Sequence, residues 1–165
     1  MAKESSFDIV SSVDMQEIDN AYGQAKREMS QRYDLKDSGS TIELDKQSKT
    51  ITITAPADFV VGQIVDILTS KLIRRGIDIK ALKWGNNENA AGGNVRRVAS
   101  IVEGIDREIA GNINKDIKAQ KFKAKVQIEG DKLRVSSASR DTLQEVIAFV
   151  KSRDYGVPLQ FENYR

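Results

Sequence analysis

The chain has 165 residues, of which 39% are hydrophobic and 30% are charged, and its formal net charge is only +2. It contains no histidine and no cysteine, which excludes disulfides, zinc sites built on thiolate or imidazole, His-based triads and cysteine nucleophiles. No apolar run approaches the roughly 20 residues that a membrane span needs, and nothing at the start resembles an export signal, so we expect a cytoplasmic protein without a membrane segment.

Strands and helices are predicted in a regular order over the first half of the chain. Alternating apolar residues predict strands, and apolar residues at three- and four-residue steps predict helices. Asp14 has the position of a helix N-cap, with Glu17 at capping-box spacing, and Pro56 suits the first turn of a second helix. The elements expected here are a strand at 7–13, a helix from 14 to about 29, a β-hairpin at 39–55, a helix from about 56 to 76 and a strand at 79–84.

The same order of elements recurs after a polar, glycine-rich segment, GNNENAAGG, which is typical of a linker. Ser139 has the position of a helix N-cap, and Pro158 precedes the last strand-like run. The elements expected in the second half are a strand at 96–105, a helix from about 106 to 121, a β-hairpin at 123–137, a helix from 139 to 150 and a strand at 159–164.

The two halves of the sequence align with each other. A shift of 92 residues places Ile9 on Ile101 and Asp14 on Asp106, and a shift of 82 residues superimposes the hairpins and the helices that follow them. Two matched segments in the same order indicate a duplication. The predicted fold class is therefore α+β, a tandem duplication of a ferredoxin-like βαββαβ sandwich in which two helices cover one face of an antiparallel sheet.

The duplication also predicts the domain boundaries. We assign residues 1–84 to the first ferredoxin-like repeat, 85–94 to a linker and 95–165 to the second repeat. Nothing in the pattern requires the first strand of a repeat to join its own sheet. A flexible linker between two similar units also permits the terminal strands to be exchanged between the repeats.

Five lysines lie in the eleven residues 115–125, KDIKAQKFKAK. Those in the predicted helix lie opposite or beside its isoleucine stripe and are explained as a solvated helix face. In the predicted hairpin, the alternation turns Lys123, Lys125, Lys132 and Arg134 away from the helices. We therefore predict a basic face on the second sheet that binds the phosphate of a nucleotide or nucleic acid. The alternative is a solubilising surface that blocks edge pairing.

Three further arginines are candidates for phosphate binding. Arg96 and Arg97 begin the strand after the linker, at the junction of the repeats, where two guanidinium groups can clamp a phosphate. Arg140 stands at the start of a helix, whose free N–H groups attract anions, although a simple helix cap is the favoured explanation of that segment. Arg74 and Arg75 lie in a last helical turn and are explained by the helix dipole.

The usual signatures of catalysis and of base recognition are missing from the sequence. Neither a P-loop nor a Rossmann fingerprint is present, and no paired carboxylates or activated nucleophile can be identified, so we expect a protein that is not an enzyme and has no cofactor or metal. The predicted open face of the second sheet carries no aromatic residue for base stacking. An RNA partner would therefore be bound mainly through its phosphate backbone.

Four long blocks of the sequence carry a resemblance to a known family. They are, in chain order, SFDIVSSVDMQEIDNA, VVGQIVDILTSKLIRRGID, IEGDKLRVSSASRDTLQEVIAFVK and GVPLQFENYR. With these blocks the chain resembles the YajQ family of bacterial nucleotide-binding proteins nearly from end to end. The resemblance implies a cytosolic, non-enzymatic protein of two ferredoxin-like repeats with strands exchanged between them.

The resemblance also implies a ligand, because the family is associated with nucleotides, in some members with cyclic di-GMP and transcriptional regulation, and an association with RNA has been proposed. It maps no ligand contacts onto this chain, so the candidate residues rest on charge. The leading hypothesis is a module that binds GTP, ATP or cyclic di-GMP and signals to a partner protein such as a transcription regulator. The alternative is an RNA-associated protein that binds the phosphate backbone through a basic sheet face.

Overall fold

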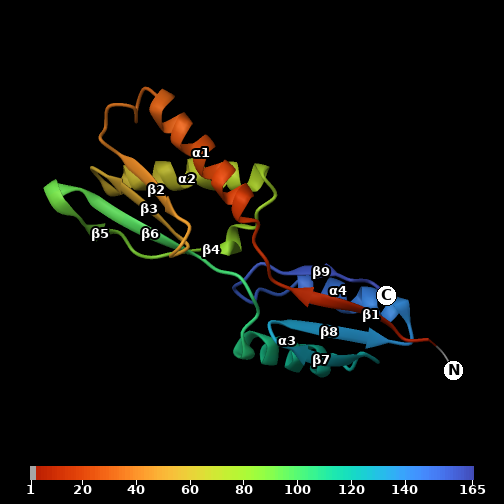
Figure 1. Ribbon diagram of the computed structural model, residues 1–165. Coiled ribbons are helices and arrows are strands. Elements are labelled where there is room, and N and C mark those ends of the chain that lie inside the picture. Colours follow the sequence, from red (N-terminus) through yellow and green to blue (C-terminus); the bar gives the residue numbers. More distant parts are fainter. Residues whose placement is uncertain (1–2) are drawn as a thin grey trace. The chain divides into compact units, whose positions relative to one another are not determined.

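The computed structural model describes residues 3–165, and the order of elements in it is βαββαβ twice over (Figure 1). The helices are α1 (Met15–Gln31), α2 (Asp58–Arg74), α3 (Arg107–Ala119) and α4 (Arg140–Lys151). The strands are β1 (Ser5–Val10), β2 (Thr41–Asp45), β3 (Thr50–Ala55), β4 (Leu82–Trp84), β5 (Glu88–Asn89), β6 (Val95–Ile101), β7 (Lys125–Glu129), β8 (Lys132–Ser137) and β9 (Gln160–Glu162). None of these helices is long and apolar enough to cross a membrane.

The strands form two antiparallel sheets. Sheet A has the order β7-β8-β1-β9, and sheet B has the order β2-β3-β6-β4, with the short β5 paired to β6. Both sheets therefore follow the strand order of a ferredoxin-like sandwich, and a helix pair covers one face of each: α3 and α4 on sheet A, α1 and α2 on sheet B (Figure 1). The predicted fold class is confirmed.

The first strand of each repeat lies in the sheet of the other repeat. Strand β1 pairs with β8 and β9 of the second repeat, while β6 pairs with β3 and β4 of the first. As a result of this exchange, Phe7 and Ile9 of β1 are fully buried in the core that α3 and α4 cover. Complete burial of two such side chains stabilises the fold by roughly 1.5–3 kcal/mol each.

The compact units of the structure consequently differ from the predicted boundaries. One compact unit, unit 1, holds residues 3–12 and Glu103–Arg165, and the other, unit 2, holds Val13–Val102. The segment 85–94, predicted as a linker, lies inside unit 2, where β5 pairs with β6 and the Gly85 amide donates to the Val98 carbonyl at 2.8 Å. The reason is the strand exchange, since β6 follows this segment and belongs to the sheet of the first repeat.

The predicted helix caps are present in both repeats. The Asp14 carboxylate accepts from the amides of Gln16 and Glu17, and the Asp106 carboxylate accepts from the amide of Ile109 at 2.8 Å. The Ser139 hydroxyl likewise accepts from the amide of Thr142. Equivalent aspartates therefore begin α1 and α3, as expected for duplicated units.

Candidate functional site

The open face of sheet A, which is the face away from α3 and α4, has a carboxylate at its centre. The strand register aligns Gln127, Arg134, Asp8 and Glu162 in one row across β7, β8, β1 and β9. Asp8 is only 1% exposed, and its Oδ1 atom accepts from Nε of Arg134 at 3.0 Å. Its Oδ2 atom accepts from Nδ2 of Asn163 at 2.9 Å and is 3.4 Å from Nζ of Lys132. A residue of the first repeat thus neutralises cations of the second.

Two opposing effects act on the pKa of Asp8. Burial disfavours the charged carboxylate and raises the pKa, but the hydrogen bonds from Arg134, Asn163 and Lys132 stabilise the ionised form and outweigh burial. The net result is a pKa of about 2. Asp8 is therefore ionised at neutral pH and holds Arg134 and Lys132 as a structural network.

This network corrects the prediction of a basic face on the second sheet. Arg134 is paired with Asp8 and lies 3.6 Å from Glu129, and Lys132 is paired with Asp8. Lys123 and Lys125 are exposed and make no ion pair with any residue from 3 to 165. The face carries carboxylates as well as cations, because β1 brings Asp8 from the first repeat and because Glu129 and Glu162 also point outward.

The arginine pair predicted at the linker does not form a clamp. Arg96 and Arg97 are adjacent on β6, so their side chains leave opposite faces of sheet B. Arg96 pairs with Glu88 at 3.4 Å, whereas Nε of Arg97 donates to the Gly85 carbonyl at 2.8 Å and its guanidinium lies 5.3 Å from the ring centre of Trp84. The two side chains therefore make separate contacts with the segment between β4 and β6, and they do not face a common ligand site.

Arg140 is exposed at the first position of α4, and its Nε atom lies 3.5 Å from the Ser5 hydroxyl, a weak hydrogen bond. It lies on unit 1, on a different unit from Arg96 and Arg97. The seven predicted site residues are thus divided between the units, with Arg96 and Arg97 on unit 2 and the other five on unit 1. Among the described residues, no group of three or more acidic side chains could hold a metal ion.

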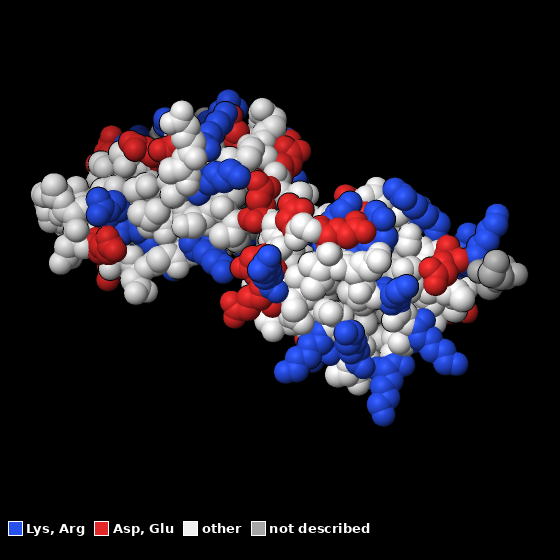
Figure 2. Space-filling view, turned by 60° about the horizontal axis from the view of Figure 1, so that its bottom comes forward, with Lys and Arg blue, Asp and Glu red and all other residues white. Residues whose placement is uncertain are grey.

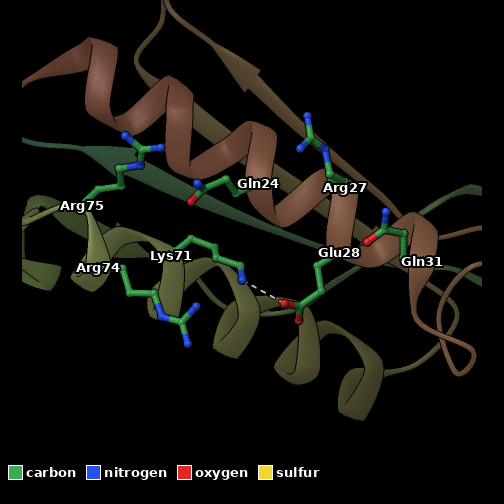
Figure 3. A pocket seen from close by; sticks show the side chains of 7 residues that line it. All are labelled: Gln24, Arg27, Glu28, Gln31, Lys71, Arg74 and Arg75. Atoms are coloured by element: carbon green, nitrogen blue, oxygen red, sulfur yellow. Dashed lines mark ion pairs between the residues drawn. The ribbon is translucent and has the colours of Figure 1, made fainter.

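A cation-lined groove lies instead on the outer side of the helix pair of unit 2, between α1 and α2 (Figure 3). Its volume is about 400 Å³. The residues that line it are Gln24, Arg27, Glu28 and Gln31 on α1 and Lys71, Arg74 and Arg75 on α2. Three- and four-residue steps place each set on one side of its helix, so two rows of long polar side chains face the same hollow.

The groove has two kinds of cation. Lys71 reaches across to Glu28 at 2.9 Å (Figure 3), which is the main reason that the pKa of Glu28 is lowered. Arg75 lies 3.5 Å from Glu17. Arg27 and Arg74 are exposed, one on each helix, and neither makes an ion pair within the described chain. These two arginines leave the groove with an excess of positive charge that an anion can neutralise.

Sequence reasoning missed this groove as a binding site. It explained Arg74 and Arg75 by the dipole of α2 and did not consider Arg27. Two rows of polar residues in the sequence could have indicated it, because the predicted fold packs their two helices side by side. The rows lie at positions 24, 27, 28 and 31 and at positions 71, 74 and 75. A helix-dipole role and a ligand role are compatible, because both need a cation at the end of α2.

A second basic surface lies on unit 1, and we call it the lysine ridge. It consists of Lys115, Lys118, Lys121, Lys123 and Lys125, all exposed on α3, on β7 and between them. None of the five makes an ion pair within the described chain. Figure 2 shows Lys and Arg side chains projecting singly from the lower part of this unit rather than surrounding a hollow.

Comparisons with known proteins give one consistent result. The family model for "Nucleotide-binding protein YajQ-like" matches residues 5–165. A nucleotide-binding protein of Geotalea uraniireducens is 49% identical over 97% of this chain and 98% of its own length. Proteins of the same name from Desulforamulus reducens and Chloroherpeton thalassium are 48% and 45% identical, each over 100% of this chain and over 99% and 100% of their own lengths.

Proposed function

The chain belongs to the family of YajQ-like nucleotide-binding proteins, and we propose that it binds a nucleotide through its phosphates in the groove between α1 and α2. The observation that carries this proposal is the pair of arginines, Arg27 and Arg74, that line the groove without an ion-pair partner among residues 3–165. Guanidinium groups bind phosphate oxygens through paired, charged hydrogen bonds, and these two arginines bring one such group to the groove from each helix.

The groove suits this role better than the open face of sheet A. A concave site surrounds a small ligand and excludes part of its water, which strengthens each charge interaction. On sheet A, Lys132 and Arg134 are already held by Asp8, so a phosphate would have to displace an internal carboxylate. Lys123 and Lys125 remain available there, one just before β7 and one at its first position, and both are exposed.

The proposal extends to the mode of action. The protein acts without transforming its ligand, as a cytoplasmic effector that binds GTP, ATP or cyclic di-GMP and passes the signal to a protein partner such as a transcription regulator. Turnover of GTP or ATP by the purified protein with magnesium would contradict it.

A matched pair of double variants tests the site. The first variant, Arg27→Gln/Arg74→Gln, removes two positive charges from the groove. The second, Lys123→Gln/Lys125→Gln, removes two positive charges from the exposed lysines at β7 that the sequence predicted as a phosphate site. Calorimetry against GTP, ATP, cyclic di-GMP and a short RNA identifies the ligand. We expect the groove variant to bind it about tenfold or more weakly, because charged hydrogen bonds are each worth roughly 1.5–3 kcal/mol. The sheet variant should bind like the wild type.

The same experiment decides on the second candidate function, RNA binding through its phosphate backbone. The five unpaired lysines of the lysine ridge are the observation in its favour. If RNA is bound and only Lys123→Gln/Lys125→Gln weakens it, with an affinity that falls steeply with salt, the ridge is the binding surface and the groove proposal is wrong.

A further inference from the structure

Strand β7 is the outermost strand of sheet A, and its outer edge pairs with no strand of the described chain. The β7–β8 hairpin turns at Gly130–Asp131, so Glu129 and Lys132 close it as a hydrogen-bonded pair. Hydrogen-bonded and non-hydrogen-bonded pairs alternate along an antiparallel hairpin. The amide and carbonyl groups of Val126 and Ile128 therefore point away from β8 and form a backbone edge that can accept a further strand.

The apolar residues of β7 are incompletely covered. Ile128 is 47% exposed, although its register partner on β8 is Leu133, which is fully buried in the core beneath α3 and α4. Val126 lies opposite the buried Val135 and is itself only half-buried. Residues that face each other across two strands lie on the same side of the sheet. The core side of sheet A therefore ends at β7 in an apolar margin that solvent reaches.

The charges of β7 are separated along the strand. Lys125 is its first residue and Glu129 its last, and two-residue steps place both on the open face with Gln127 between them. The chain around β7 continues this order, because Lys123 precedes the strand and Asp131 follows it in the turn. The edge thus has cations at one end and anions at the other, so it is complementary to a copy of itself that runs in the opposite direction.

An antiparallel pairing of two β7 strands centred on Gln127 satisfies all three features. It places Lys125 of each copy opposite Glu129 of the other. It also places the exposed Ile128 of each copy beside Val126 of the other, on the core side of both sheets. Because Val126 and Ile128 carry the outward backbone groups, they meet as hydrogen-bonded pairs.

The equivalent edge of the other repeat lacks this complementarity. Strand β2 is the outermost strand of sheet B, and its exposed residues Thr41, Glu43 and Asp45 include two anions and no cation. A second copy placed antiparallel to the middle of β2 would bring Glu43 against Glu43, and like charges directly opposite each other are destabilising. The apolar Ile42 of β2 is only 2% exposed. The self-complementary edge is therefore specific to β7.

We propose that two copies of this chain associate edge to edge through β7, which joins their four-stranded sheets into one antiparallel sheet about a two-fold axis at Gln127. The surface lies on unit 1 and is separate from the proposed nucleotide site, whose groove is on unit 2. Interfaces below roughly 1,000 Å² are weak or transient. With five residues in each strand the interface is small, so we expect a reversible dimer that forms in concentrated solution and dissociates in dilute solution.

An exchange of charges tests the register. Lys125→Glu and Glu129→Lys each place like charges opposite each other twice in the dimer, and each should weaken association about tenfold or more in sedimentation equilibrium. An equimolar mixture of the two variants should associate as tightly as the wild type, because a carboxylate then faces an ammonium group at both contacts. The double variant Lys125→Glu/Glu129→Lys should regain the wild-type affinity for the same reason. Circular dichroism checks that each variant is folded.

A matched pair of substitutions tests the backbone edge. Ile128→Pro removes an outward amide of β7 and leaves the amides that pair with β8, as proline does on edge strands, and it should abolish association. Ile128→Ala keeps that amide and loses only apolar contact, so it should weaken association a few-fold. Arg27→Gln/Arg74→Gln, on unit 2, should associate like the wild type.

Several results would overturn the inference. They are a wild type that stays monomeric in concentrated solution, single charge variants that associate like the wild type, and a mixture of the two that remains monomeric. Association that disappears after nuclease treatment would assign the edge to a nucleic acid instead. A groove that binds no nucleotide would leave all of these measurements unchanged, so the two proposals can fail separately.

Discussion

The open face of sheet A and the groove of unit 2 both carry several cations, but they differ in what those cations contact. On sheet A, Asp8 lies between Arg134 and Lys132 and uses them to satisfy a buried carboxylate. In the groove, Arg27 and Arg74 have no ion-pair partner among residues 3–165, and the surface around them is hollow. The number of cations on a surface therefore says little until the carboxylates that reach the same surface have been subtracted.

The strongest test of this comparison removes the carboxylate of sheet A. Asp8→Ala leaves Arg134 and Lys132 without their partner and should lower the free energy of unfolding by about 3 kcal/mol, because loss of one member of a buried ion network is costly. Breaking a buried ion pair typically costs roughly 3–5 kcal/mol. We expect the lower end of this range because Lys132 and Arg134 are partly exposed and can turn toward water. Urea denaturation followed by circular dichroism measures it.

The control for Asp8→Ala is Glu162→Ala. Glu162 lies beside Asp8 in the strand register on the same face, but it is exposed. Its removal should change the free energy of unfolding by no more than about 0.5 kcal/mol. An Asp8→Ala protein as stable as this control would mean that the Asp8 network is not structural, and sheet A would again be a candidate for anion binding.

The second test uses pH. The pKa of Asp8 is about 2 in the folded protein and about 3.9 for a carboxyl in an unfolded chain, so its contribution is complete above about pH 4 and is lost as pH falls through about 2. The contribution is on the order of 2 kcal/mol. Acid titration of urea midpoints should show a smaller loss of stability between pH 4 and 2 in Asp8→Asn than in the wild type. Equal losses would contradict the network.

The sequence predicted the fold well because the fold depends on short-range patterns. Alternation, helical periodicity and the caps at Asp14 and Asp106 are local, and they recur in both repeats. The exchange of β1 and β6 was left open, since the apolar pattern of Phe7 and Ile9 fits either core equally. Only the three-dimensional pairing shows which sheet each strand joins.

The site was harder to predict for the same reason. Lys125, Lys132 and Arg134 lie on one face of the β7–β8 hairpin, and Lys123 lies just before β7. Asp8, however, is 124 residues from Lys132 and reaches it only through the exchanged strand. Arg96 and Arg97 are adjacent in sequence, and this adjacency sends them to opposite faces of β6. The groove requires two helices to be considered together, which a search along one segment at a time does not do.

The smallest expected effect concerns the lysine ridge. Lys125 is the first residue of β7 and Lys123 lies two positions before it, and both side chains are exposed, so their like charges repel. Lys123→Gln/Lys125→Gln should therefore raise the free energy of unfolding slightly, by about 0.3 kcal/mol at low salt, and the gain should vanish at 1 M salt, where the screening length is about 3 Å. Urea denaturation at both ionic strengths measures the difference. A loss of stability would instead show that these lysines, like Lys132 and Arg134, contact a carboxylate, and the distinction between a structural part and an accessible part of this face would no longer hold.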